Sequence, residues 1–216
     1  MLCMLCRWGL NSSPEGKDHG FTHCFTLTFD SEADRDAYLP HPAHQHFGAT
    51  YVRGAVDDVF VLDHCEPQNS CRCLGCARSH QGMTQFLPEF WVAPMLSGQP
   101  CGAGALDVDW RPAAPRKGVL RHLVCYKFEE GTAEEDKLAR VDGFAELIEA
   151  VGTVRSFEWG TNNSPEGKAH GFTHCFCLTF DTEADRDAYL PHPAHVAYGE
   201  KHVKAADVLV LDTLLD

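Results

Sequence analysis

The chain contains the same sequence twice. Residues 8–53 align without a gap with residues 159–204, and 34 of these 46 positions are identical. The alignment then slips by two residues and resumes with residues 58–63 against 207–212. Stacked repeat architectures need at least three units to bury a continuous core, so two copies do not make a solenoid. The pattern therefore predicts one type of domain that is present twice.

The two copies differ in the sequence that precedes them. About 40 patterned residues, starting near Val119, come before the second repeat, but only seven residues come before the first. The first copy therefore lacks its front half. We expect a truncated domain at 1–65, a linker rich in Pro, Gly and Cys at 66–118, and a complete domain at 119–216. About 98 residues suffice for an independently folding domain.

Hydrophobic periodicity predicts the elements of the complete copy. Residues 120–128 alternate between inward and outward side chains and are rich in strand-forming residues. Apolar residues at spacings of three and four from Leu138 to Val151 predict a helix, which we expect to begin at a capping box formed by Thr132 and Glu135. Further strands are expected at 154–159, 172–180 and 208–214.

A second helical region is predicted between the last two strands. Thr182 and Asp185 resemble a helix start, and Pro191 should end this helix near Leu190 because proline disfavours helical geometry at the residue before it. A short helix should restart at Pro193, since proline suits the first helical position. The order β-α-β-β-α-β predicts an α+β, ferredoxin-like fold. The first copy keeps β-β-α-β, with its last strand at 58–63.

The predicted strands carry apolar residues on both faces. Side chains alternate along a strand, so Phe176 and Leu178 share one face with His174, and Cys175 and Cys177 share the other. Helices on one side of a four-stranded sheet leave its second face bare, and an exposed apolar face normally marks an interface. We therefore expect self-association through sheet faces into a dimeric α+β barrel, either as a homodimer or between the two copies of one chain.

The charge and composition exclude several classes of protein. The formal net charge is −13, so the chain repels phosphate backbones and anionic membrane surfaces, and no nucleic-acid partner is expected. No stretch approaches the roughly 18 apolar residues that a membrane span requires. Eleven cysteines, an odd number, follow a start without the features of a signal peptide. We therefore expect free thiols and a cytoplasmic location.

Three segments of the complete copy resemble a known family. They are His122-Leu-Val, Gly171-Phe-Thr-His174 and Tyr189-Leu-Pro-His-Pro-Ala-His195. They are similar to the stress-responsive A/B barrel domain, over all of residues 119–216 and over part of 8–65. The resemblance implies a ferredoxin-like protomer, a homodimer of sheets, a stress-response function without firmly implied catalysis, and room for a small hydrophobic or aromatic ligand. It implies no cofactor.

The family also contains a plant polyketide cyclase, which closes a ring by aldol condensation without a cofactor. By that resemblance His195 is the candidate catalytic base and Tyr189 the oxyanion donor, while His122 and His174 are candidate ligand-binding residues. A neutral imidazole can deprotonate a carbon flanked by carbonyls, and a phenol can donate a hydrogen bond to the developing enolate oxygen. The competing interpretation is structural, with these residues as hydrogen-bonded core groups. Whether the chain is an enzyme stays open.

The first copy keeps only part of this residue set. His23, Tyr38 and His44 correspond to His174, Tyr189 and His195, but the strand that carries His122 has no counterpart. An incomplete sheet cannot close a pocket, so we expect the first copy to be inactive as a site.

A metal site has one candidate in the linker. Cys71, Cys73, Cys76 and His80 are ligand types that zinc prefers, but a second ligand pair is missing, and free thiols are the competing interpretation. We expect no metal. A third functional hypothesis, a cofactorless monooxygenase or haem-handling barrel, rests on the wider α+β barrel group alone, and no haem motif is visible.

Overall fold

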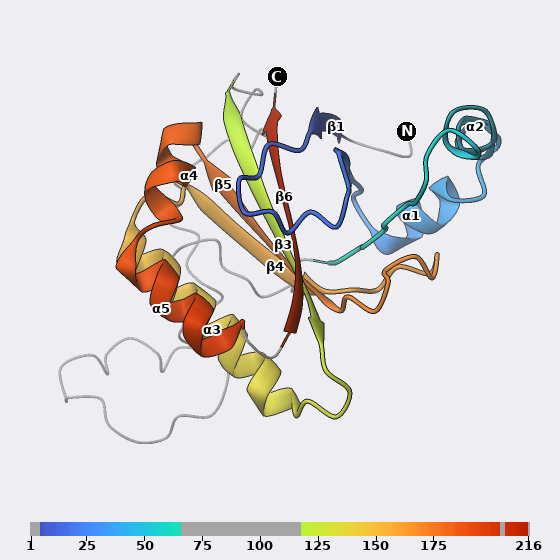
Figure 1. Cartoon of the computed structure of the whole chain (residues 1–216). Helices are drawn as coiled ribbons and strands as arrows, with labels where there is room; N and C mark the ends of the chain where they lie inside the picture. The colour runs from blue at the N-terminus through green and yellow to red at the C-terminus, as the bar shows by residue number, and fades with distance from the viewer. Residues whose placement is uncertain (1–4, 66–117, 204–205, 216) are drawn as a thin grey trace, which may run out of the picture. The chain divides into compact units, whose positions relative to one another are not determined.

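A computed structural model of the chain describes residues 5–65, 118–203 and 206–215 (Figure 1). All of these residues belong to one compact unit. The proposed zinc ligands and nearly all of the expected linker lie outside the described residues. The division of the chain at residues 65 and 118 therefore stays a prediction.

The complete repeat folds as an antiparallel sheet of four strands in the order β4-β5-β3-β6. The helices α3 and α5 pack side by side on one face of this sheet (Figure 1). The order along the chain confirms the ferredoxin-like α+β prediction. The elements are β3 (Val119–Phe128), α3 (Glu134–Val151), β4 (Ser156–Thr161), β5 (His174–Phe180), α4 (Glu183–Tyr189), α5 (Pro193–His202) and β6 (Ala206–Leu215).

The helix boundaries show which local signals the chain uses. The Thr182 hydroxyl accepts a hydrogen bond from the backbone N–H of Asp185 at 3.2 Å and so caps α4, as predicted. Proline at the start of α5 also agrees with the sequence. The predicted capping box at Thr132 is wrong, because the Thr132 hydroxyl donates to the Glu129 carbonyl at 2.7 Å. Ala133 precedes α3 instead, without a side-chain cap.

Aromatic side chains dominate the core between the sheet and the helices. Phe176 of β5 is completely buried and stacks on Phe144 of α3, with ring centroids 4.6 Å apart. Tyr126 packs against the other side of this group, and its hydroxyl donates to the Tyr198 hydroxyl at 3.3 Å. The strand face that the sequence assigned to Phe176 and Leu178 is therefore the face that the helices cover.

The truncated repeat forms a two-stranded sheet and three short helical segments. The strand predicted at 58–63 is wrong, since these residues form no strand. The physical reason is the missing front half: the corresponding strand β6 pairs along its length with β3, and the truncated repeat has no counterpart of β3. The elements are β1 (Leu5–Leu10), β2 (His23–Thr28), α1 (Glu32–Tyr38), α2 (Pro42–Phe47) and a π-helical turn (Gly48–Val52).

Apolar side chains of the truncated repeat lie partly in solvent. Phe25 is 56% exposed, whereas the identical residue at the corresponding position, Phe176, is completely buried. Phe47 is 47% exposed, against 7% for its counterpart Tyr198. In the complete repeat this face is covered by β3 and α3, for which the truncated repeat has no equivalent.

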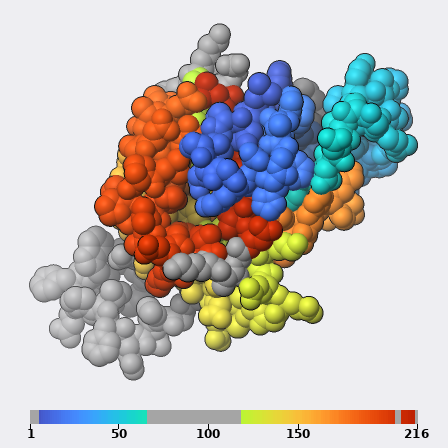
Figure 2. Space-filling view, viewed as in Figure 1, coloured from blue at the N-terminus to red at the C-terminus, as the bar shows by residue number. Residues whose placement is uncertain are grey.

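The second face of the four-stranded sheet packs against the truncated repeat. Phe21, Phe60 and Leu62 come from the truncated repeat and contact a buried cluster on the face opposite the helices. Figure 2 shows the N-terminal residues lying against the atoms of the complete repeat. The two repeats of one chain therefore pair through sheet faces. The buried cluster on the side of the complete repeat consists of Cys125, Phe172, Cys175, Leu209 and Leu211.

The hydrogen bonds between the repeats are reciprocal. The backbone N–H of Ser12 donates to the Asp212 carbonyl at 2.9 Å, and the N–H of Asn163 donates to the Asp63 carbonyl at 2.8 Å. These two bonds are equivalent to each other, because the donor Ser12 aligns with the donor Asn163 and the acceptor Asp212 aligns with the acceptor Asp63.

Two further pairs of bonds follow the same rule. Val210 N–H donates to the Lys17 carbonyl and Val61 N–H to the Lys168 carbonyl, at 3.0 and 3.1 Å. The side-chain oxygens of Asn11 and Asn162 accept from the backbone N–H of Asp212 and Asp63, respectively, at 3.0 and 3.2 Å. Such exchange of equivalent contacts is the signature of a two-fold interface, here between the repeats of one chain.

The contrast between Phe176 and Phe25 gives a direct test of the asymmetry. Phe176→Ala should lower the free energy of unfolding by about 3–5 kcal/mol, because it removes a buried aromatic ring and leaves a cavity. Phe25→Ala should cost about 1 kcal/mol or less, since its ring is already in solvent. Urea denaturation of both variants measures the difference. Equal losses would contradict the uneven burial.

The reciprocal interface predicts the behaviour of residues 119–216 alone. Without the truncated repeat, Leu209 and Leu211 would face solvent, so two copies should pair through this face and form a homodimer. Analytical ultracentrifugation over a range of concentrations measures the association. A stable monomer would show that the face does not need a partner.

Candidate functional site

The two predicted catalytic residues lie together. Tyr189 ends α4 and His195 lies in the first turn of α5, and their ring centroids are 4.5 Å apart. The chain turn around Pro191 makes this contact, because residues six apart on one continuous helix point to different faces. The sequence therefore predicted the convergence of these two residues correctly.

His195 is half-buried and has one nitrogen fixed. Its Nδ1–H donates to the Leu190 carbonyl at 2.8 Å, which leaves Nε2 as the unprotonated nitrogen of the neutral ring. Burial lowers the pKa of His195, and the Leu190 hydrogen bond and the nearby Glu15 carboxylate oppose this shift. The lowered pKa favours the neutral ring, which is the form that accepts a proton.

Tyr189 is completely buried, and its hydroxyl has no hydrogen-bond partner among the residues that the structure describes. Burial raises the pKa of Tyr189 well above its ordinary value, so the phenol stays protonated. A buried hydroxyl without a partner costs about 1–3 kcal/mol and is uncommon in native structures. Tyr189 therefore offers a donor that a bound molecule could use.

His122 of β3 also borders Tyr189. The two rings are 5.9 Å apart, and His122 is buried. Its Nδ1–H donates to the Asp212 carboxylate at 2.6 Å, so Asp212 fixes the orientation of the ring. The buried Arg186 pairs with the second oxygen of Asp212 and compensates its charge. The structure thus brings His122, Tyr189 and His195 into one cluster.

Glu15 also belongs to this cluster, although it comes from the truncated repeat. Its Oε1 is 3.8 Å from Nε2 of His122, and this oxygen is buried without a hydrogen-bond partner in the described part of the chain. Sequence reasoning missed Glu15. The motif Ser-Pro-Glu-Gly-Lys occurs in both repeats and has the composition of a turn, and only the pairing of the repeats brings Glu15 to the site.

His174 is the one predicted site residue that the structure does not bring to the cluster. It pairs in register with Tyr126, four residues along β3 from His122, which corresponds to roughly 13 Å. Its ring packs against Phe128 at 5.0 Å, and Nδ1 contacts the Thr173 hydroxyl. Burial lowers the pKa of His174. These contacts fit a core histidine.

The truncated repeat reproduces half of the cluster. The rings of Tyr38 and His44 are 4.4 Å apart, and Nδ1 of His44 contacts the Leu39 carbonyl at 2.9 Å. These contacts repeat those of Tyr189 and His195. The truncated repeat has no residue that corresponds to His122, because the strand that would carry it is missing from the sequence.

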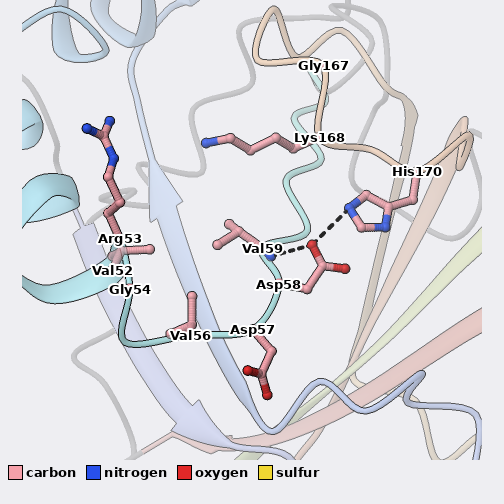
Figure 3. Close-up of a pocket in the computed structure, with 10 residues that line it drawn as sticks. All are labelled: Val52, Arg53, Gly54, Val56, Asp57, Asp58, Val59, Gly167, Lys168 and His170. Atoms are coloured by element: carbon pink, nitrogen blue, oxygen red, sulfur yellow. Dashed lines mark hydrogen bonds and ion pairs between the residues drawn. The ribbon is translucent and has the colours of Figure 1, made fainter.

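Two hollows of the surface lie away from this cluster. One, of about 400 Å³, lies between residues 52–59 of the truncated repeat and the turn at Gly167 and Lys168 (Figure 3). His170 borders it and lies 3.5 Å from the Asp58 carboxylate. A second hollow, of about 350 Å³, lies at the equivalent place beside Lys17 and His19. Tyr189 and His195 line neither of them.

Within the described ranges, no group of three or more His, Cys, Asp or Glu side chains could hold a metal ion. The cysteines at positions 6, 24, 65, 125, 175 and 177 are free thiols. The same described ranges contain no helix with the length and hydrophobicity that a membrane crossing requires.

The ferredoxin-like sheet of the complete repeat and the two-stranded sheet of the truncated repeat pair in the manner of an α+β barrel. Residues 6–65 and 120–214 match the sequence model of the stress responsive A/B barrel domain. These two regions together make up more than half of the chain, and the protein therefore belongs to this family. The match confirms the resemblance in both repeats.

Three relatives are similar to this chain. The stress-response A/B barrel domain-containing proteins HS1 and At5g22580 of Arabidopsis thaliana are 32% and 36% identical over 97 and 93 residues, which cover 44% and 43% of this chain and 89% and 81% of the relatives. Olivetolic acid cyclase of Cannabis sativa is 27% identical over 81 residues, or 38% of this chain and 80% of the cyclase.

Among solved structures, a dimeric ferredoxin-like protein of unknown function from Jannaschia sp. CCS1 is similar to this chain. Its sequence identity is 28% and its TM-score 0.40, and the match covers 44% of this chain and 97% of that protein.

The missing partner of the Tyr189 hydroxyl predicts how stability responds to its removal. Tyr189→Phe should not lower the free energy of unfolding and should raise it by up to about 1–3 kcal/mol, because no hydrogen bond is lost and the cost of the unpaired buried hydroxyl is removed. Tyr198→Phe is the matched control: its hydroxyl donates to the Arg140 carbonyl at 3.0 Å, so its removal should cost about 1 kcal/mol. Thermal and urea unfolding measure both. A loss of stability in Tyr189→Phe would mean that its hydroxyl has a structural partner.

Proposed function

We propose that the complete repeat of this stress-response A/B barrel protein binds a small molecule with an apolar body and an oxygen at one end. The observation that carries the proposal is the buried Tyr189 hydroxyl, which has no hydrogen-bond partner within the described ranges. A ligand oxygen that accepts this hydrogen bond would remove the cost of the unpaired donor. The surrounding rings of Phe180, His122 and His195 suit an aromatic or aliphatic body.

In this proposal the self-association of the protein takes place within one chain, between its two repeats. The truncated repeat takes the place that a second protomer has in a dimeric barrel, and the reciprocal hydrogen bonds of the repeats support this assignment. We place the protein in the cytoplasm, because the free thiols of the described residues suit a reducing compartment.

A second candidate function is cofactor-free proton transfer, as in the cyclase to which the chain is similar. One observation favours it: Nδ1 of His195 is occupied by the Leu190 carbonyl, so Nε2 of the neutral ring is available as a base. His195 would remove a proton from a carbon between two carbonyls, and Tyr189 would donate to the enolate oxygen. No metal or cofactor takes part in this step. Turnover of a poly-β-keto substrate that Tyr189→Phe and His195→Gln both abolish would assign the enzyme.

Binding of 4-butylphenol tests the proposed function. Isothermal titration calorimetry should show saturable binding to the full chain, and Tyr189→Phe should weaken it by roughly tenfold, since a hydrogen bond to a buried group contributes about 1 kcal/mol or more. Tyr38→Phe, the corresponding change in the truncated repeat, serves as the control and should leave the affinity unchanged. Equal affinity of the two variants would contradict the assignment of Tyr189 as the ligand donor.

A further inference from the structure

Glu15 reaches the complete repeat because the arm that carries it is fixed on both sides. Before the turn, Asn11 forms an isolated bridge with Thr213, and the Ser12 N–H donates to the Asp212 carbonyl at 2.9 Å. After the turn, the Lys17 carbonyl accepts from Val210 N–H at 3.0 Å. The turn between these bonds cannot slide along β6 without breaking them. The position of Glu15 is therefore set by the edge of the sheet.

The two oxygens of the Glu15 carboxylate differ. Oε2 accepts a hydrogen bond from Nζ of Lys17 at 3.0 Å, at the rim of the site. Oε1 is buried, accepts no hydrogen bond from any described residue, and lies 3.8 Å from Nε2 of His122, beyond hydrogen-bond distance. An ionised carboxylate oxygen is an acceptor only. The site therefore contains a strong acceptor without a donor.

The Tyr189 hydroxyl is the complementary group. It is a buried donor without an acceptor among the described residues, and the Tyr189 ring lies 5.9 Å from the same His122 ring. The negative charge of Glu15 contributes to the raised pKa of Tyr189 and opposes the lowered pKa of His195, as expected for groups in one cluster. One hydroxyl of a ligand can satisfy both groups, because it accepts from Tyr189 and donates to Glu15 at the same time.

We propose that Glu15 of the truncated repeat is a specificity-determining residue of the complete repeat's site, which selects ligands with a neutral phenol or enol hydroxyl and rejects carboxylates. This inference rests on the proposed function, because it assumes that Tyr189 contacts the ligand. A ligand carboxylate could accept from Tyr189, but it would place a second negative charge beside Glu15 and would offer it no proton. The truncated repeat thus contributes, through Glu15, to the ligand selectivity of the site in the complete repeat.

The chain offers a matched control for this test. Glu166 is the aligned residue of the complete repeat and pairs with Lys168 at 2.9 Å, as Glu15 pairs with Lys17. Its turn borders the truncated repeat, which has no counterpart of His122. Glu15→Gln and Glu166→Gln therefore remove the same charge from corresponding turns, but only the first removes it from the proposed site.

The experiment measures the affinities of the full chain for 4-butylphenol and for 4-butylbenzoate at pH 7.5. The native chain and Glu166→Gln should prefer the phenol. Glu15→Gln should lower this preference at least tenfold, because the amide is a weaker acceptor and no longer repels the carboxylate. Thermal melting of all three proteins is measured in parallel. If Glu15→Gln does not fold, Glu15→Asp is used instead. It keeps the negative charge but moves it away from the site by one methylene group, and it should also lower the preference for the phenol over the benzoate.

The outcomes separate the inference from the proposed function. If Tyr189→Phe weakens phenol binding but Glu15→Gln keeps the native preference, the role of Glu15 is refuted and the ligand site stands. Absence of saturable binding to the native chain refutes both. NMR titration of the His195 ring is independent of any ligand: Glu15→Gln should lower its pKa further and Glu166→Gln should not. An equal response to both variants would overturn the placement of Glu15 in the site.

Discussion

Asp212 is completely buried, and it connects the site to the pairing of the repeats. Its backbone carbonyl and N–H bond the arm of the truncated repeat through Ser12 and Asn11. Its carboxylate orients His122 and pairs with Arg186. A buried carboxylate is tolerated only when it is paired and hydrogen-bonded, so these contacts depend on one another. Loss of the interface would therefore also disturb the orientation of His122.

The truncated repeat keeps the segments that the pairing uses and lacks those that would cover its own helix-side face. Its arm at 11–17 bonds β6, and its segment at 61–63 bonds the equivalent arm of the complete repeat. The missing strand and helix would bury Phe25, which is exposed here while its counterpart Phe176 is buried. The pairing of the two repeats within one chain thus resembles the pairing of two subunits in a dimer.

Much of the fold could be predicted from local sequence signals. Alternating residues marked the strands of the complete repeat, and Pro191 with Pro193 marked the helix break that brings Tyr189 and His195 together. The predictions failed where the outcome depended on a distant partner. Residues 58–63 have the pattern of a strand, but a strand needs a neighbour to pair with, and the neighbour is missing from that repeat. Thr132 has the pattern of a cap, but its hydroxyl bonds a preceding carbonyl.

By itself, the sequence determined the family, the element order and three members of the cluster, which are His122, Tyr189 and His195. These features follow from periodicity, prolines and short motifs, which are signals that span only a few residues. Only the tertiary structure decided that His174 lies apart from His122. The two side chains share one face of the sheet, but His174 pairs with Tyr126, which is four residues along β3 from His122. The tertiary structure also decided the place of Glu15. The turn Ser-Pro-Glu-Gly-Lys is the same in both repeats. Glu15 in the first copy lies beside the buried His122, whereas the truncated repeat offers Glu166 no counterpart of His122. The elements that pack against a side chain therefore decide its surroundings.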